Sequence, residues 1–526
     1  MKMLKSLLHT PSGYSTRRLL QWLWGILRHH RLQAGINTLL GCLTVCLDFA
    51  FIWATKRTID IATHQTPGQL SAAAALLVGI LLSQLCIGFA SRWVKAILGV
   101  KAQNHMQLSY FDRLLHSEWQ DRNRRHSGDI LNRLERDVLD VVNTVTETVP
   151  SMAAVCLRLL GAFFFLYAMD ATLACTAVAI IPLFMLLSKL YMRKMRRLTR
   201  DIRDTDSRVQ SLLQETIQHQ MVVQTMERQS TMVRRLDQIQ RHLRGQVRTR
   251  TLFSSTSAAL LSAGFMGCYL LAFLWGAVRL HEGTITYGMM IAFIQLVGQI
   301  QGPFRDMTRF IPVFVGAFTA GERLMQLEEI PLEKKKAQKE FRSTPGVLFR
   351  RVTCSYSPES RRILEDFSYD FPPGSHTAVV GETGAGKTTL IRLMLALLRP
   401  TSGEILLYDG TEQVPCDAGM RSHFTYVPQG NTLFSGTIRD NLLMGDPRAT
   451  EEEMRAALSD ACAGFVFQLP QGLDSRCGEH GTGLSEGQAQ RIAIARALLR
   501  PGGILLFDEA TSALDTETER QLWRNI

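Results

Sequence analysis

Six long apolar runs constrain this 526-residue chain more than any other feature of its sequence. A membrane-spanning helix needs about 20 mostly apolar residues, because the helix must satisfy its own backbone hydrogen bonds in lipid. A soluble domain does not need six such runs. We therefore expect an all-α, six-helix transmembrane domain over residues 32–327. The predicted spans are residues 32–55, 70–91, 148–169, 171–191, 252–278 and 285–304 or beyond.

Lys and Arg are distributed unequally among the segments that connect these runs. The short connections hold three, whereas the N-terminal segment holds six and the long connections 92–147 and 192–251 hold nine and fourteen. The positive-inside rule then places both termini and both long connections in the cytoplasm. This distribution accounts for the net charge of +12 without a nucleic-acid partner. We predict an integral protein of the bacterial inner (plasma) membrane, surrounded by membrane lipid.

Three polar or amphipathic segments of the membrane half carry further expectations. Residues 1–31 contain a basic amphipathic stretch with Trp22 and Trp24, which favours a helix in the membrane interface over an ordinary solvent-facing helix. The long connections have helical periodicity. Residues 121–128, a polar break in the first long connection, are a candidate contact point for a second domain, although a solvated turn would have the same pattern.

Two charged residues, Asp48 and Arg158, lie inside predicted spans, where an ionised group is costly and usually faces a partner or a water-filled cavity. They can pair with each other or contact a substrate, and we favour the pair. The ten cysteines include no Cys-x-x-Cys motif, so no zinc or redox motif is indicated.

A phosphate-binding motif follows the polar linker 328–345, at the start of a region, 346–526, long enough for an α/β domain. Residues 381–388 read GETGAGKT and match G-x-x-x-x-G-K-[ST], between a predicted buried strand at 376–380 and a predicted helix at 389–398. The backbone N–H groups of such a loop bind phosphates, which predicts ATP and Mg²⁺ as cofactors. The predicted strand before the motif and the predicted helix after it argue against a chance Gly-rich turn. The predicted phosphate-binding residues are Gly381, Glu382, Thr383, Gly384, Ala385, Gly386, Lys387, Thr388 and Thr389.

Four side chains have predicted chemical roles in this region. Lys387 should reach the β- and γ-phosphates, and the Thr388 hydroxyl should coordinate Mg²⁺. Residues 503–509 (GILLFDE) form a predicted buried strand that ends in two carboxylates. Asp508 is expected to hold Mg²⁺ through water, and Glu509 to act as the general base on the attacking water.

The sequence LSEGQ at 484–488, followed by AQRIAIAR, resembles the signature LSGGQ-x-QR of ABC ATPases. Residues 126–133 (HSGDILNR) and 283–288 (GTITYG) of the membrane half also resemble ABC exporter segments, so that the resemblance covers nearly the whole chain. The resemblance implies that Tyr356 stacks on adenine and that Gln429 senses the γ-phosphate and contributes to catalysis and the metal site. It also implies nucleotide contacts from Ser485, Gly487, Gln488 and Asp515.

Members of this family act as head-to-tail pairs, with each ATP between one phosphate loop and the partner's signature. One copy of each motif implies a half-transporter that exports a lipid, a drug-like amphiphile or a peptide, as a homodimer or a heterodimer. In the family a switch histidine follows the catalytic glutamate, and no histidine follows Glu509 here, so we expect either a fragment or a hydrolytically impaired chain.

The signature also departs from the family pattern, because Glu486 replaces its first glycine. An ATP-binding regulatory or hydrolysis-deficient membrane subunit that works only with a partner is therefore an open alternative. A soluble ABC protein acting on DNA or ribosomes is disfavoured by the six apolar runs.

Overall fold

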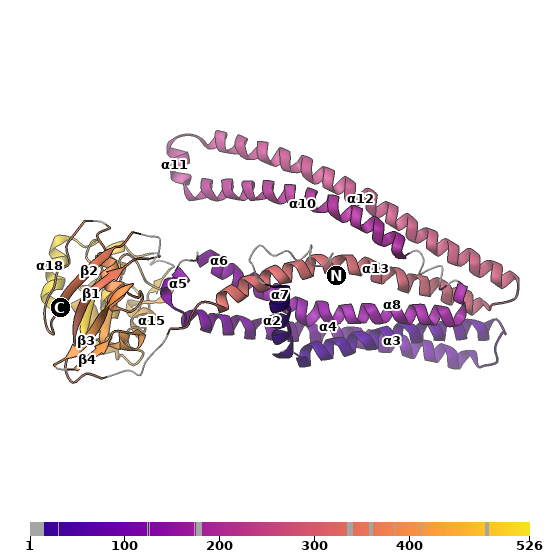
Figure 1. The fold of residues 1–526 in the computed structure, drawn as a ribbon, viewed down its shortest axis with the longest axis horizontal. Helices are drawn as coiled ribbons and strands as arrows, with labels where there is room; N and C mark the ends of the chain where they lie inside the picture. The colour runs from indigo at the N-terminus through magenta and orange to yellow at the C-terminus, as the bar shows by residue number, and fades with distance from the viewer. Residues whose placement is uncertain are drawn as a thin grey trace. The chain divides into compact units, whose positions relative to one another are not determined.

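The computed structural model describes residues 15–29, 31–123, 125, 127–172, 174, 181–333, 340–356, 361–382, 384–410, 412–478 and 483–526. The chain divides into a helical unit, drawn from Met1–Leu108 and Asn132–Met325, and an α/β unit, drawn from Ser109–Leu131 and Gln326–Ile526. Figure 1 shows long helices in the first and strands with short helices in the second. A helical domain followed by an α/β domain confirms the predicted fold class.

The helical unit is built mainly from helices far longer than those of a soluble domain. Among the described residues, four helical segments are long and apolar enough to cross a membrane: Arg31–Ala62, Leu70–Leu115, Gly128–Met169 and Gln229–His281. Each contains one predicted span. Residues 173 and 175–180 of the run 171–191 lie outside the described residues, and most of the run 285–304 falls in α13, which is not among the four. The long helices are α2 (Thr16–His29), α3 (Arg31–Ala62), α4 (Leu70–Leu115), α8 (Val149–Met169), α10 (Ile181–Gln218), α12 (Gln229–His281) and α13 (Tyr287–Glu328).

The helix that leads into α8 contains two π-helical turns, which the sequence pattern did not predict. Its parts are α6 (Ser127–Asn132), η1 (Arg133–Asp137), α7 (Val138–Asn143) and η2 (Thr144–Thr148). A π turn replaces the usual i to i−4 hydrogen bonds, is rare, and is frequently found at functional sites. The Asn37 side chain on α3 donates to the Thr146 carbonyl at 2.8 Å, and this contact helps to fix the second π turn.

The favoured pair between the two charged residues of the spans forms in the structure. Nη2 of Arg158 lies 2.7 Å from Oδ2 of Asp48, and Nε2 of Gln84 donates to Oδ1 of Asp48 at 3.2 Å. The cluster joins α8, α3 and α4. Pairing is the arrangement expected for opposite charges placed within apolar helices.

In the N-terminal segment, α2 has one buried and one exposed face. Leu19 is 1% exposed, whereas the basic residues Arg17, Arg18 and Arg28 are exposed, as is Trp24. The Trp22 ring packs close to Gly321 of α13. This division agrees with an amphipathic helix, and its place at a membrane interface stays a prediction.

The α/β unit contains an antiparallel sheet of order β2-β1-β3-β4 and a parallel pair, β5 and β8. The strands are β1 (Gly346–Cys354), β2 (Leu364–Phe371), β3 (Ser402–Asp409), β4 (Glu412–Pro415), β5 (Phe424–Val427), β6 (Gly436–Thr437), β7 (Arg476–Cys477) and β8 (Ile504–Phe507). The inward side chains of β1 and β3 pack with α14 (Lys387–Met394) in one buried core. This core supports the helix that follows the phosphate loop.

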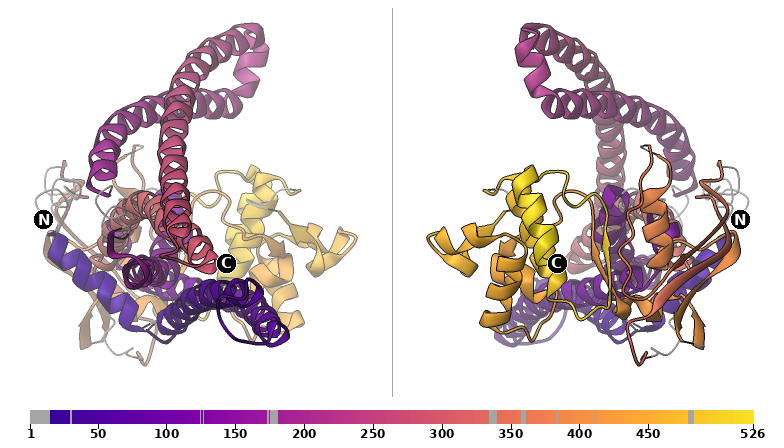
Figure 2. Two further views of the ribbon diagram at one scale, coloured as in Figure 1. Left: turned by 90° about the vertical axis from the view of Figure 1, so that its right-hand side faces the viewer. Right: turned by 90° about the vertical axis from the view of Figure 1, so that its left-hand side faces the viewer.

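A second core lies among the helices that follow β5. The capping boxes of Thr437, Thr450 and Ser485 fix where three of these helices begin. The helices are α15 (Ile438–Leu443), α16 (Glu451–Asp460), α17 (Glu486–Leu498) and α18 (Thr516–Asn525), with 3₁₀ turns η3 (Ala418–His423), η4 (Gly464–Gln468) and η5 (Gly472–Asp474). Figure 2 shows this group beside the strands.

The predicted buried strand at 376–380 is wrong. These residues are in no strand, and the Val380 side chain is 91% exposed. An apolar run indicates a strand only if neighbouring strands offer hydrogen bonds, which local sequence does not specify. Among the described residues the parallel ladder consists of β5 and β8, and the run 376–380 does not extend it. The helix predicted at 389–398 is present as α14, which begins and ends earlier.

A bulge in the antiparallel sheet makes Gly403 necessary. The register between β1 and β3 shifts between Arg350 and Thr353, where Arg351 has φ +48°. Opposite the bulge, Gly403 has φ +83°, and a Cβ added there would lie 2.2 Å from the Arg351 carbonyl oxygen. The close atom belongs to the backbone, so it cannot rotate away.

Gly403→Ala is therefore expected to destabilise the α/β unit by about 2–4 kcal/mol, through both strain and overlap. Gly410→Ala is the matched control, because Gly410 has φ +61° with open space around it. The control should cost only about 1 kcal/mol. Thermal unfolding of the purified chain measures both, and equal losses would show that the overlap has no effect.

Candidate active site

The phosphate loop begins α14 through two glycines in the left-handed region. Gly384 has φ +87° and Gly386 has φ +100°. A Cβ on Gly386 would lie 2.8 Å from Cγ2 of Ile363, so both conformation and space require glycine. The loop therefore leads directly into the N-terminus of α14, where free backbone N–H groups favour the binding of an anion.

Lys387 lies at the centre of a group of predicted site residues. Its Nζ donates to the Gly381 carbonyl at 2.8 Å and is 3.6 Å from Oε1 of Glu509. The other carboxylate oxygen of Glu509 accepts from Nε2 of Gln429 at 2.7 Å. The structure therefore brings together the predicted phosphate-binding lysine, general base and γ-phosphate sensor.

Glu509 has a strained backbone, with φ +49° in the left-handed region. A residue other than glycine in this conformation costs about 1–3 kcal/mol and is found mainly at functional sites. The side chain of Gln490 on α17 donates to the Glu509 carbonyl at 3.4 Å. The left-handed conformation thus occurs at the residue whose carboxylate lies beside Lys387.

Asp508 and Thr388 supply oxygen atoms that fit a magnesium ion. Oγ1 of Thr388 donates to Oδ1 of the buried Asp508 at 3.0 Å. Mg²⁺ prefers such oxygen donors and usually takes one or two carboxylates together with substrate phosphates.

Tyr426 on β5 is a neighbour of this pair. Its hydroxyl donates to Oδ2 of Asp508 at 3.4 Å. Burial raises the pKa of Tyr426 to about 12, and the negative charge of Asp508 adds to the increase. Tyr426 therefore remains a neutral donor at physiological pH, and it orients the carboxylate beside Thr388.

Tyr356, the predicted adenine-stacking residue, has its hydroxyl directed toward α14. The hydroxyl is 3.2 Å from Oγ1 of the buried Thr389 and accepts from Nη1 of Arg392 at 2.8 Å. Glu382 and Ala385 form the turn of the loop, in which the Ala385 N–H donates to the Glu382 carbonyl. Thr383 lies outside the described residues.

The predicted signature residues begin α17, a different element from the one that carries the phosphate loop. Ser485 caps α17, with its hydroxyl accepting from the Gln488 N–H, and Glu486 is exposed in the first turn. A Cβ on Gly487 would lie 2.6 Å from the Ala513 carbonyl oxygen. Asp515 caps α18, and hydrogen bonds from Thr518 hold the pKa of its carboxyl below the usual value.

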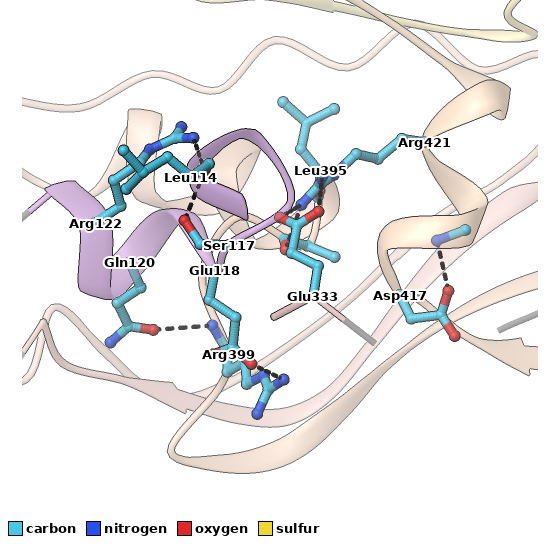
Figure 3. A network of polar contacts seen from close by, with 12 residues as sticks. Leu114, Ser117, Glu118, Gln120, Arg122, Glu333, Leu395, Arg399, Asp417 and Arg421 are labelled. Atoms are coloured by element: carbon cyan, nitrogen blue, oxygen red, sulfur yellow. Dashed lines mark hydrogen bonds and ion pairs between the residues drawn. The ribbon is translucent and has the colours of Figure 1, made fainter. Parts of the chain in front are cut away.

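A short segment before α6 docks beside the phosphate-binding core, within the same unit. It contains the end of α4 and the short helix α5 (Trp119–Asn123). Arg399 forms an ion pair with Glu118, and its backbone N–H donates to Oε1 of Gln120 at 3.4 Å (Figure 3). The contact begins just before the predicted contact point, 121–128.

A second ion pair anchors the chain that enters this domain. Both guanidinium nitrogens Nη1 and Nη2 of Arg421 donate to Glu333 at 2.8 Å, and Arg421 also donates to the Leu395 carbonyl (Figure 3). The Glu333 N–H donates to the His116 carbonyl at 2.9 Å. Bidentate pairing of this kind fixes orientation as well as distance.

Sequence reasoning missed Trp119, Arg392 and Tyr426. Arg392 and Tyr426 look like ordinary members of a helix and a strand, and no local signal marks them. Trp119 does carry a signal, because a large aromatic residue stands two positions before the polar break at 121–128.

Two protein-family models match most of the chain. The model described as ABC transporter transmembrane region matches residues 35–304, and the model described as ABC transporter matches residues 364–512. The second match includes the phosphate loop, the signature and the two terminal carboxylates of the 503–509 run.

The chain is also similar to individual curated and solved proteins. It is 30% identical to an ATP-dependent lipid A-core flippase of Pseudomonas fluorescens, over 86% of this chain and 76% of that protein. An uncharacterized ABC transporter ATP-binding protein of Bacillus subtilis is 31% identical, over 76% and 70% respectively. A solved bacterial Atm1-family ABC exporter with ATP bound shares the fold, with a TM-score of 0.75 and 23% identity, over 95% of this chain and 89% of that one.

Proposed function

This chain belongs to the ABC transporter family, and on that premise we propose that it is a half-transporter that exports a lipid across the bacterial inner membrane as a dimer. ATP hydrolysis coupled to transport follows from the family and from its ATPase domain. The lipid cargo is supported by relatives from several bacteria that are named lipid A-core flippases. The observation that carries the proposal is the grouping of Lys387, Gln429 and Glu509 in a chain that also contains a membrane domain of this family.

The proposed chemistry uses each member of this group in turn. ATP enters with its phosphates on the N–H groups of the loop and replaces the Gly381 carbonyl and Glu509 as the partner of Lys387. Glu509, released from the lysine, accepts a proton from the attacking water, and Gln429 holds the carboxylate in place. Bound Mg²⁺, held by Thr388 and Asp508, would supply positive charge against the phosphates.

A second copy or a related partner is needed to complete each site, because the signature residues Ser485 and Gly487 would face the partner's ATP. The helical hairpin of α10, α11 (Gln220–Thr225) and α12 supports a dimer. Its tip lies away from α3 and α8 in Figures 1 and 2. Exposed apolar side chains gather at this tip, as expected of a surface that a partner covers: Ile217, Met221, Val222 and Met226.

Lipid export is tested in proteoliposomes that contain the purified chain and a fluorescently labelled lipid. ATP should make the labelled lipid move between leaflets, measured by its access to a membrane-impermeant quencher. The Glu509→Gln variant should bind ATP without moving the lipid. ATP turnover that a soluble peptide stimulates, with no lipid movement, would contradict the lipid cargo while leaving the pump intact.

The exposed Glu486 gives a separate expected result. Its carboxylate would stand near the partner's triphosphate, where one added charge at close range costs about 1 kcal/mol in a watery site. Glu486→Gln removes the charge and keeps the shape, so KM for ATP should fall about 3- to 5-fold. ATPase titrations measure this, with Glu452→Gln as an exposed control in another helix. An unchanged KM would place Glu486 away from the phosphates.

A further inference from the structure

One arginine joins the docked segment to the predicted adenine side of the site. Cζ of Arg392 lies 5.0 Å from the centroid of the Trp119 ring on α5, and Nη1 donates to the Tyr356 hydroxyl at 2.8 Å. The same hydroxyl is 3.2 Å from Oγ1 of Thr389 in the first turn of α14, just after the phosphate loop. A single guanidinium therefore contacts a residue from each of two segments far apart in the sequence.

This contact is partly buried, so the interactions of the Arg392 guanidinium are stronger than those of an arginine exposed to solvent. Trp119 and Tyr356 both pack against the core of β1, β3 and α14, and Arg392 is half-buried between them. A guanidinium over an aromatic face gains more when water is partly excluded, and a hydrogen bond from a charged donor is about twice as strong as a neutral one. The positive charge of Arg392 also acts on Tyr426, whose hydroxyl contacts Asp508 on the metal side.

Other contacts already hold the docked segment in place. The ion pair of Glu118 with Arg399 and the bidentate pair of Glu333 with Arg421 fix its backbone without Arg392. The Trp119–Arg392–Tyr356 chain is therefore one of several contacts that hold this segment. Its distinctive property is that one end reaches the residue predicted to meet the base of the nucleotide.

We propose that Arg392 is a positioning residue that relays adenine binding at Tyr356 to Trp119 of α5. The inference rests on the proposed role of Tyr356 in stacking on adenine. A purine on Tyr356 fixes the angle of the ring and hence the position of the hydroxyl. Because Arg392 is hydrogen-bonded to that hydroxyl, the guanidinium follows the hydroxyl and shifts over the face of the Trp119 ring. The docked segment thereby receives a signal from the base, separate from the signal of the phosphates.

The test compares two ligands that share phosphates and differ in the base. The fluorescence of Trp119 is obtained in the full chain as the difference between the parent and Trp119→Phe, during titration with Mg²⁺ and either AMP-PNP or tripolyphosphate. We expect a Trp119 signal with AMP-PNP and none with tripolyphosphate. Arg392→Leu should abolish the signal and weaken AMP-PNP binding about 3- to 10-fold, the size of one partly exposed charge-assisted hydrogen bond.

Three further variants make the result specific. Arg392→Lys keeps the charge and should restore part of the signal. Tyr356→Phe keeps the ring and removes the hydroxyl, so it should bind AMP-PNP but lose the signal, and it replaces Arg392→Leu if that variant does not fold. Arg362→Leu, at an exposed arginine 3.8 Å from Glu365, should change neither signal nor affinity.

The possible outcomes separate the relay from its premise. A Trp119 signal that survives in Arg392→Leu or Tyr356→Phe overturns the relay. An equal signal from tripolyphosphate also overturns it, because the phosphates alone would then be sensed. If Tyr356→Leu leaves the ratio of AMP-PNP to tripolyphosphate affinity unchanged, the adenine role of Tyr356 fails, and the inference fails with its premise.

Discussion

Glu509→Gln is expected to lower ATP turnover by about 10²- to 10⁴-fold, the contribution of a positioned general base. The amide has nearly the same shape as the carboxylate but cannot accept the proton of the attacking water. The strained backbone of Glu509 and the hydrogen bond from Gln429 Nε2 both serve to aim this one side chain. Positioning the side chain no longer raises the rate when an amide, which is not a base, replaces the carboxylate.

ATP binding by the same variant should be preserved or tightened. The carboxylate of Glu509 is 3.6 Å from Lys387 Nζ, and removing its charge frees the lysine for phosphate. Phosphate release measures turnover, and retention of labelled ATP after gel filtration measures trapping. Glu452→Gln, at an exposed glutamate in α16, is the control and should behave like the parent. Turnover within about threefold of the parent would assign the base elsewhere.

The sequence predicted the centre of this site because the residues involved are consecutive or belong to known motifs. Gly384 and Gly386 have the positive φ values that a phosphate loop requires. Lys387 and Thr388 are the first two residues of the helix that follows the loop, so the motif also specifies their positions. Asp508 and Glu509 were found for a similar reason, since an apolar run that ends in two carboxylates is visible in one dimension.

Contacts between distant segments could not be predicted in this way. Nothing in the sequence joins Trp119 to Arg392, because each lies on a helix whose facing partner is set by the tertiary fold. The two π turns were not predicted because an apolar pattern assigned over a whole segment does not specify which backbone hydrogen bonds close each turn. The run 376–380 shows the opposite error, because its apolar pattern suggested a buried strand and the structure has an exposed segment there that pairs with no described strand.

Lys387→Ala should produce the largest loss of affinity, about 10²-fold in the dissociation constant for ATP, or about 3 kcal/mol. The ammonium group is partly buried and is held by the Gly381 carbonyl at 2.8 Å, so it is already positioned where the phosphates would lie. Truncation removes this charge and also leaves the carboxylate of Glu509 without its cation, facing an incoming triphosphate. Both effects oppose binding.

The double variant Lys387→Ala with Glu509→Gln separates these two effects. If repulsion from Glu509 contributes, the double variant should recover part of the affinity that Lys387→Ala loses, about 3- to 10-fold. Equilibrium binding of a fluorescent ATP analogue measures all four members of the cycle. Arg448→Ala, at a side chain that is 92% exposed, is the control for the loss of a positive charge. No recovery would mean that Lys387 acts on the phosphates alone, and that its contact with Glu509 matters only while the nucleotide is absent.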